Sequence, residues 1–197
     1  MVRPGRDRLS GRIEVDETYL GGLEVGMKGR QTERKSLIVI AAQEDGAGIG
    51  RIRMKRIPDA SGNSLMGFIE EVTEPGSTVH TDGWKGYSAV EEKGFVHQVT
   101  VVKSKKESAS DLLPRVHLIA SLLKRWIMGT HQGAISHEHL EFYLDEFTFR
   151  FNRRRSRNRG KLFDRMVQQA VMIDPVPYKS MIRCGKNGAK RNHNHNL

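Results

Sequence analysis

Two aspartates, Asp16 and Asp82, point most directly to chemistry in this chain. Asp16 interrupts the alternating run GRIEVDETYL, and Asp82 stands before a glycine in HTDGWKGY. A carboxylate among strand neighbours that bury it is costly unless a cation or several hydrogen bonds compensate its charge. A divalent metal ion does both, and Mg²⁺ commonly takes one or two carboxylates, with waters and substrate phosphates completing the shell. The pair therefore predicts metal-assisted phosphoryl transfer.

Each aspartate also has a purely structural interpretation. Asp16 could be a charge at a strand edge, and Asp82 could simply form an Asp-Gly turn. Strand alternation turns Glu17 away from Asp16, which makes Glu17 a weaker candidate. The residues alone leave these alternatives open.

The segments around the two acids predict a mixed α/β fold. Alternation begins at Arg12, SLIVIAA is a continuous apolar run, and GRIRMKRI alternates again, so we expect three strands in an antiparallel meander. In the third strand the alternation predicts an exposed basic face with Arg51, Arg53 and Lys55. Two further short strands are expected, one ending on Asp82 and one over HQVTVV.

Helical periodicity marks the remaining elements. DASGNSLMGFIEEV is expected to form a crossover helix, and a second helix is expected with Pro114 in its first turn and Ser110 or Asp111 as its N-cap. Ser136 should cap a third helix, and a last short helix should cover residues 162–172. The apolar stripe of the second helix should face the sheet; it comprises Val116, Ile119, Ala120, Leu123 and Ile127.

The charge balance indicates a polyanionic partner. The 197 residues include 33 Lys plus Arg against 23 Asp plus Glu, a formal charge of +10, and the pI is near 9.9. Nucleic acid is the first candidate. The chain has no long apolar run, no signal-peptide pattern and no lipidation motif, so we expect a cytoplasmic, nucleoid-associated protein without a membrane partner. The single Cys184 excludes an internal disulfide.

Several motifs occur between about Arg12 and Tyr178, namely VDETYLGG, HTDGWKGY, the long segment from SLLKRW to FNRRRS, and RGKLF. Together and in this order they resemble the catalytic domain of DDE-type insertion-sequence transposases of the ISXO type. The resemblance implies an RNase H-like fold, a mixed sheet of about five strands flanked by helices, with a helical C-terminal extension. It also implies Mg²⁺- or Mn²⁺-dependent cleavage at transposon ends, with joining of the 3′-hydroxyl to target DNA.

The same resemblance assigns site residues. Asp16 and Asp82 match the family's first two acids. Relatives carry Glu or Asn at the third position, and by alignment Glu falls at His117 and Asn at Pro114, so this chain has neither. The prediction is therefore a catalytic and metal-binding set of Asp16, Asp82 and His117, with Glu107 and Asp111 as reserve candidates for a third oxygen ligand. His117 and Lys124 share a helix face, since seven residues return a helix almost to the same angle. Imidazole suits Mn²⁺ better than Mg²⁺.

Basic side chains near these motifs are the predicted DNA contacts. Between Arg150 and Lys161 the chain has seven basic residues and no acid, which favours phosphate contact over a merely solvated helix end. The predicted DNA-binding residues are Lys124, Arg125, Arg150, Arg153, Arg154, Arg155 and Arg157. Double-stranded DNA, as transposon ends and as target, is the expected partner, with a homodimer in the synaptic complex.

The resemblance and the composition together predict the domain organisation. We expect a flexible basic arm over residues 1–11, the catalytic domain over 12–130, its helical extension over 131–178 and a disordered tail over 179–197. Relatives carry a DNA-recognition region ahead of the first acid, whereas Asp16 stands close to the start here. The two resulting hypotheses are a transposase catalytic domain and, alternatively, an inactive, truncated remnant that only binds DNA.

Overall fold

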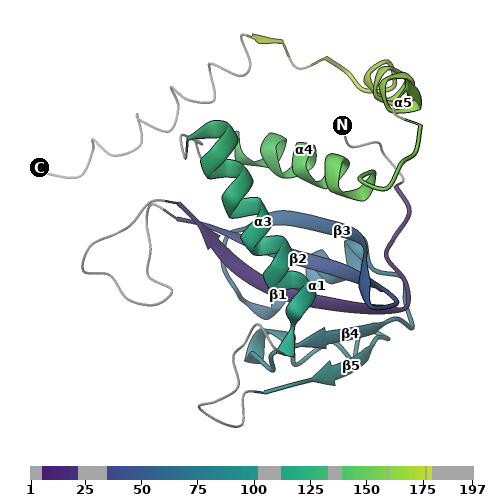
Figure 1. Ribbon diagram of the computed structural model, residues 1–197. Coiled ribbons are helices and arrows are strands. Elements are labelled where there is room, and N and C mark those ends of the chain that lie inside the picture. The colour runs from purple at the N-terminus through teal and green to yellow at the C-terminus, as the bar shows by residue number, and fades with distance from the viewer. Residues whose placement is uncertain are drawn as a thin grey trace, which may run out of the picture.

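A five-stranded sheet lies at the centre of the computed structural model, which describes residues 6–21, 35–101, 112–132, 139–158, 160–175 and 177–178 (Figure 1). The strands are β1 (Arg12–Leu20), β2 (Ser36–Asp45), β3 (Gly48–Ile57), β4 (Thr78–Thr81) and β5 (Val96–Val99). The helices are α1 (Gly62–Val72), the short 3₁₀ helix η1 (Lys85–Tyr87), α3 (Pro114–His131), α4 (Leu140–Asn152) and α5 (Gly160–Ala170). The predicted caps Ser110, Asp111 and Ser136, the reserve ligand Glu107 and the tail from residue 179 lie outside the described residues.

The strand order explains how distant segments meet. Across the sheet the order is β3-β2-β1-β4-β5, with β1 antiparallel to β2 and β2 antiparallel to β3. The remaining two strand pairs are parallel: β4 pairs with β1, and β5 pairs with β4. An antiparallel meander followed by two parallel strands is the arrangement of the RNase H-like fold, so the predicted fold class is confirmed.

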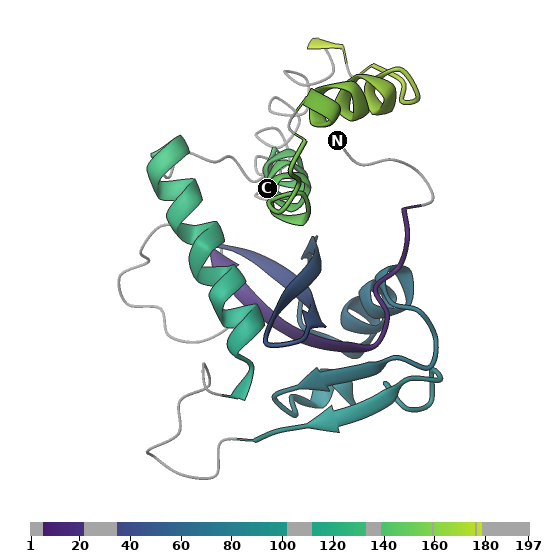
Figure 2. The same cartoon turned by 45° about the vertical axis from the view of Figure 1, so that its right-hand side comes forward.

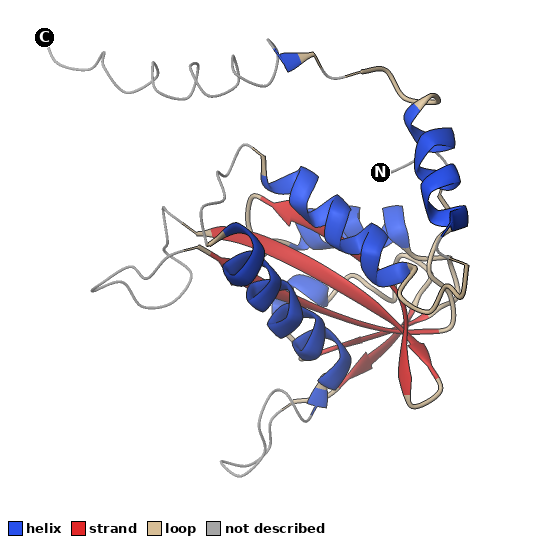
Figure 3. Ribbon diagram, turned by 45° about the horizontal axis from the view of Figure 1, so that its top comes forward, coloured by secondary structure: helices blue, strands red, loops and turns tan. Residues whose placement is uncertain are grey.

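Each face of the sheet has its own core. On β1, Ile13 and Val15 pack with α1 and η1 in one cluster. The other face packs against α3 and α4, and all five residues of the predicted α3 stripe are buried there. Figure 3 shows these two helices lying over the strands. Because β1 alternates, Glu14 and Asp16 point to the α3 face, between the sheet and that helix.

The segment before β1 differs from the expected flexible arm. Leu9 is fully buried in the α1-side cluster. Its backbone N–H donates to Val72 O at 2.7 Å, and its carbonyl accepts from Glu74 N at 2.8 Å. Burying one leucine and pairing its backbone at the end of α1 fixes this stretch, whereas residues 1–5 lie outside the described part of the chain.

Helix α4 covers the free edge of β3. The Asn152 side chain accepts a hydrogen bond from Ile52 N at 2.7 Å and donates one to Ile52 O at 3.1 Å. Edge strands present unpaired backbone N–H and C=O groups, and Asn152 pairs with both of these groups of Ile52. The prediction that the β3 arginines form an exposed basic face is wrong for Arg53, which is only 5% exposed. The segment before β1 and the end of α4 cover it, an arrangement that strand alternation cannot reveal.

Helix α5 lies beyond α4, away from the sheet (Figures 1 and 2). Phe163 and Val167 on this helix are largely exposed. Among the described residues, no helix has both the length and the apolar character needed to cross a membrane.

Candidate active site

Asp16 lies on β1, and Asp82 follows directly after the adjacent strand β4. The last parallel pair between β1 and β4 is Glu14 with His80, and each aspartate follows its strand's paired residue by two positions. Two residues along a strand return a side chain to the same face, so both acids belong to the face that packs against α3. The Asp16 side chain is 19% exposed, and Asp82 is exposed.

The turn after β4 orients Asp82. Its Oδ1 accepts a hydrogen bond from Trp84 N at 2.9 Å, so the turn role considered for Asp82 is present. Gly83 has φ +83°, and a Cβ there would stand 2.7 Å from a Val99 side-chain carbon. Only glycine fits this conformation and this space.

Helix α3 brings His117 against Asp16. His117 Nε2 lies 3.6 Å from Asp16 Oδ2, close enough for an ion pair when the imidazole is protonated. Asp16 Oδ1 meanwhile accepts from Glu17 N at 2.8 Å. A cavity of about 110 Å³ opens here, and Asp16, His117 and Lys124 all line it. The structure therefore brings together three of the predicted residues, while Asp82 lies outside this lining.

The carboxylates are chemically suited to a hard divalent cation. Asp16 comes from β1 and Asp82 from the residue after β4, and Mg²⁺ often takes only one or two protein carboxylates. Within the described residues, no group of three or more Asp, Glu, His or Cys side chains could hold a metal ion by itself. The ligand roles of Asp16, Asp82 and His117 stay predictions.

Glu14 fixes the start of α3 on β1. Its side chain is 1% exposed, and Oε2 accepts from the backbone N–H groups of Arg115 at 2.7 Å and Val116 at 3.1 Å. Oε1 accepts from Arg115 Nη1 at 2.8 Å. A carboxylate thus satisfies two unpaired N–H groups at the positive end of the helix dipole. Because His117 follows within the first turn, this contact sets its position opposite Asp16.

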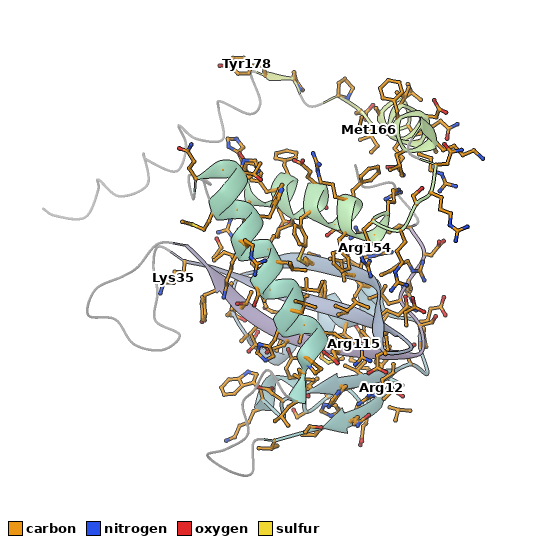
Figure 4. All side chains as sticks on the ribbon, viewed as in Figure 1. Arg12, Lys35, Arg115, Arg154, Met166 and Tyr178 are labelled. Carbon is orange, nitrogen blue, oxygen red and sulfur yellow. The ribbon has the colours of Figure 1, made fainter. Side chains whose placement is uncertain are left out.

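Further charges extend this contact toward β4 (Figure 4). Glu44 on β2 pairs with Arg115 Nη1 at 2.9 Å and with Arg12 Nη1 at 2.6 Å. Arg12 Nη2 lies 3.1 Å from Nδ1 of the buried His80, whose Nε2 meets Thr100 Oγ1 at 2.7 Å. Burial first, and then the Arg12 charge, lower the pKa of His80. A neutral imidazole that accepts from Arg12 and donates to Thr100 satisfies both contacts.

Glu17 has its partner on the opposite face of the sheet. The fully buried Tyr87 donates its hydroxyl to Glu17 Oε2 at 2.8 Å. Burial raises the pKa of Tyr87 well above its ordinary value, and the Glu17 charge and hydrogen bond, then Asp16 and Asp82, raise it further. Tyr87 therefore stays a protonated donor beneath the two acids, and Glu17 turns away from Asp16 as predicted.

The predicted DNA-binding arginines at the end of α4 have partners within the chain. Arg150 pairs with Glu146 at 2.8 Å, and Arg155 pairs with Asp45 at 2.6 Å. Arg154 donates to the carbonyls of β3 residues and lies over the Phe151 ring. These contacts fix the segment on β3, and phosphate contact stays a prediction for it. Arg125 and Arg157, like Lys124, are exposed, and Arg153 lies over the Phe149 ring.

Sequence reasoning missed the residues that position the site. Glu14, Arg115 and Tyr87 were not among the candidates, although Glu14 shares a strand face with Asp16 in the alternating run. That alternation is a signal for Glu14, since a buried acid requires a partner. Nothing local points to Arg115 or Tyr87, which are about 70 to 100 residues from their partners.

The chain is similar to several solved structures. The simian T-cell lymphotropic virus intasome in complex with PP2A regulatory subunit B56 gamma contains a chain with a TM-score of 0.47 and 14% identity; the match covers 76% of this chain and 50% of that one. The catalytic domain of Mos1 mariner transposase matches with a TM-score of 0.41 and 14% identity, and the match covers 90% of this chain and 80% of that one. A chain of the Mos1 strand transfer complex matches with a TM-score of 0.41 and 15% identity, and the match covers 94% of this chain and 56% of that one. This chain thus spans 50% of the length of the matched intasome chain and 56% of the matched chain in the strand transfer complex.

The sequence itself decides the family. No curated protein matches the chain. The profile of the ISXO2-like transposase domain matches residues 8–152, well over half of the chain and all the elements from β1 to α4. The chain therefore belongs to the ISXO2-like transposase domain family.

Proposed function

We propose that this chain is a transposase catalytic domain that cleaves DNA at the ends of an insertion sequence and joins the free 3′-hydroxyl to target DNA. Membership of the transposase domain family supports a role in transposition. The observation that supports the catalytic proposal is that Asp16 lies on β1 next to β4, which Asp82 directly follows, with His117 Nε2 3.6 Å from Asp16 Oδ2.

Each side chain then has a defined part. Asp16 and Asp82 would hold Mg²⁺ or Mn²⁺, and the ions would supply the Lewis acidity that activates the attacking oxygen and stabilises the leaving one. Lys124, on the same cavity as Asp16, would bind a phosphate oxygen of the bound strand. His117 would add a nitrogen ligand through Nε2, the atom that faces Asp16.

Substitution of the acids tests the proposal. We expect Asp16→Asn and Asp82→Asn to abolish metal-dependent nicking of supercoiled plasmid DNA while both variants keep the wild-type circular dichroism spectrum. Asp164→Asn, which removes an exposed acid on α5, is the matched control and should leave nicking unchanged. Nicking that persists at the wild-type rate in Asp82→Asn would remove Asp82 from the site.

The imidazole offers a second test, because nitrogen ligands favour Mn²⁺ over Mg²⁺. We expect more nicking with Mn²⁺ than with Mg²⁺ in the wild-type chain. His117→Glu places an oxygen ligand at this position and should move the preference toward Mg²⁺. An unchanged metal preference in His117→Glu would show that His117 does not contact the metal.

A DNA-binding remnant without catalysis is the alternative. It is favoured by the lack, within the described residues, of a three-ligand group around Asp16. Calorimetric titration of Mn²⁺ into the wild-type chain and Asp16→Asn separates the two functions. Saturable binding that the variant loses supports the enzyme, whereas DNA binding without metal binding or nicking supports the remnant. In either case we propose a homodimer as the form that brings two DNA ends together.

A further inference from the structure

A basic hollow lies apart from the candidate active site. It has a volume of about 480 Å³ and opens between β3, α4, α5 and the segment before β1. None of its lining residues lines the cavity at Asp16. It is formed at the outer edge of the sheet, two strands away from β1. Any ligand here would contact the chain independently of the two catalytic acids.

Guanidinium groups dominate its lining. Five arginines line it, namely Arg6, Arg51, Arg53, Arg153 and Arg165, against only two acids, Asp7 and Asp145. Like charges gathered at one place repel each other, and an anion bound among them removes that repulsion. The fork of N–H donors on arginine matches the oxygens of a phosphate group.

Arg53 shows that the positive charge is built into the fold. It is 5% exposed and donates to two backbone carbonyls, Ile52 O at 2.9 Å and Asp7 O at 2.6 Å. Burial, followed by the charges of Arg6 and Arg51, lowers the pKa of Arg53 to about 10, although Asp7 partly offsets these effects. The Arg53 guanidinium is still charged at neutral pH, so the fold keeps a buried cation in the lining of the hollow.

The lining favours a phosphate backbone over a base. Phe149 is its only aromatic residue, and the Arg153 guanidinium covers that ring at 3.9 Å from the centroid. One face of the single aromatic ring in the lining is therefore already covered, which leaves little for bases to stack on. A neighbouring hollow of about 300 Å³ shares Arg51 and Asn152 with this one and adds Arg154 and Arg155, together with the acids Glu44 and Asp45. Arginines thus continue around the end of α4, although Arg155 is paired with Asp45 there.

We propose that the hollow between β3, α4 and α5 is a second DNA site, which binds the phosphodiester backbone of duplex DNA outside the catalytic centre. It rests on the proposed function only in taking DNA as the substrate. Contacts of this kind position a duplex without reading its sequence. They would hold the DNA at the β3 edge while another part of it reaches Asp16.

Salt-dependent binding tests this site without any catalysis. The double variant Arg6→Gln/Arg165→Gln removes two charges from the lining, and the structure gives neither side chain an ion pair or hydrogen bond within the described residues. The control Lys55→Gln/Lys93→Gln removes two charges that pair with Glu71 and Glu70 on α1. Both proteins are titrated with a duplex of arbitrary sequence in EDTA, at salt concentrations from about 50 to 200 mM.

We expect the slope of log K against log salt to become shallower by about 1 to 2 in the Arg6/Arg165 variant, at about 0.9 for each phosphate that the variant no longer neutralises. The control should keep the wild-type slope. Equal slopes in all three proteins overturn the proposal, and so does an equal change in both variants or a wild-type chain that does not bind the duplex. ATP provides a further arm of the test. If the Arg6/Arg165 variant keeps the wild-type salt slope but loses the thermal stabilisation that ATP gives to the wild type, the hollow binds a small phosphate ligand, and the proposal of a DNA site is overturned.

Failure of the proposed function is a separate result. Asp16→Asn should bind the duplex with the wild-type salt slope, since Asp16 does not line this hollow. A chain that shows the predicted slopes but no nicking would retain the second DNA site and lose the catalytic proposal.

Discussion

Replacing Glu14 by alanine should destabilise the protein and loosen the start of α3. The change removes the acceptor of three hydrogen bonds, two from backbone N–H groups and one from the Arg115 guanidinium. It leaves those donors in a region where Glu14 itself was 1% exposed. Because α3 carries His117, the effect should reach the candidate active site.

The contacts set the expected magnitude. Breaking a buried ion pair by removing one partner costs about 3–5 kcal/mol, because the other charge is left uncompensated. Arg115 keeps Glu44 at 2.9 Å and is 17% exposed, which favours the lower end of this range. We therefore expect Glu14→Ala to lower the free energy of unfolding by about 3 kcal/mol. Glu14→Gln keeps an acceptor oxygen and should cost about 1–2 kcal/mol.

Chemical denaturation at neutral pH measures these values, with Glu74→Ala as an exposed control that should change stability by less than about 0.5 kcal/mol. Hydrogen exchange gives the local result, since the amides of Arg115 and Val116 should lose protection in Glu14→Ala. A decrease of less than about 1 kcal/mol, with those two amides still protected, would refute the reasoning, because such a carboxylate would contribute little to fixing α3.

Three further predictions concern other parts of the fold. Tyr87→Phe removes the hydroxyl that donates to Glu17 and should cost about 1–2 kcal/mol in urea denaturation; an unchanged midpoint would contradict it. Asn152→Ala unpairs both backbone groups that it contacts on the edge of β3 and should cost about 1–3 kcal/mol, with Asn152→Asp, which keeps one acceptor, costing less. The pKa values of His80 and His97 are lowered, mainly by burial, so the unfolded chain binds protons more readily than the folded one. Stability should therefore fall as the pH drops below about 6.5, and His80→Gln should weaken that dependence while His97 preserves part of it; an identical pH profile for His80→Gln would contradict this.

Local pattern determined most of the elements of this protein. Alternation in GRIEVDETYL correctly predicts β1 and separates Ile13 from Glu14, and helical spacing correctly predicts which face of α3 is buried. These features follow from the 2.0- and 3.6-residue periods, which depend only on neighbouring residues. The candidate acids Asp16 and Asp82 were also found from the sequence, through residue type and resemblance to a family.

Tertiary structure decided what surrounds those acids. Glu14 meets Arg115, and Glu17 meets Tyr87, only because the sheet order brings β1 between β2 and β4 and places α3 across it. Arg53 is buried although its strand pattern predicts exposure, since segments distant in the chain close over it. Periodicity says which way a side chain points, whereas only the packing of distant elements determines what it meets there.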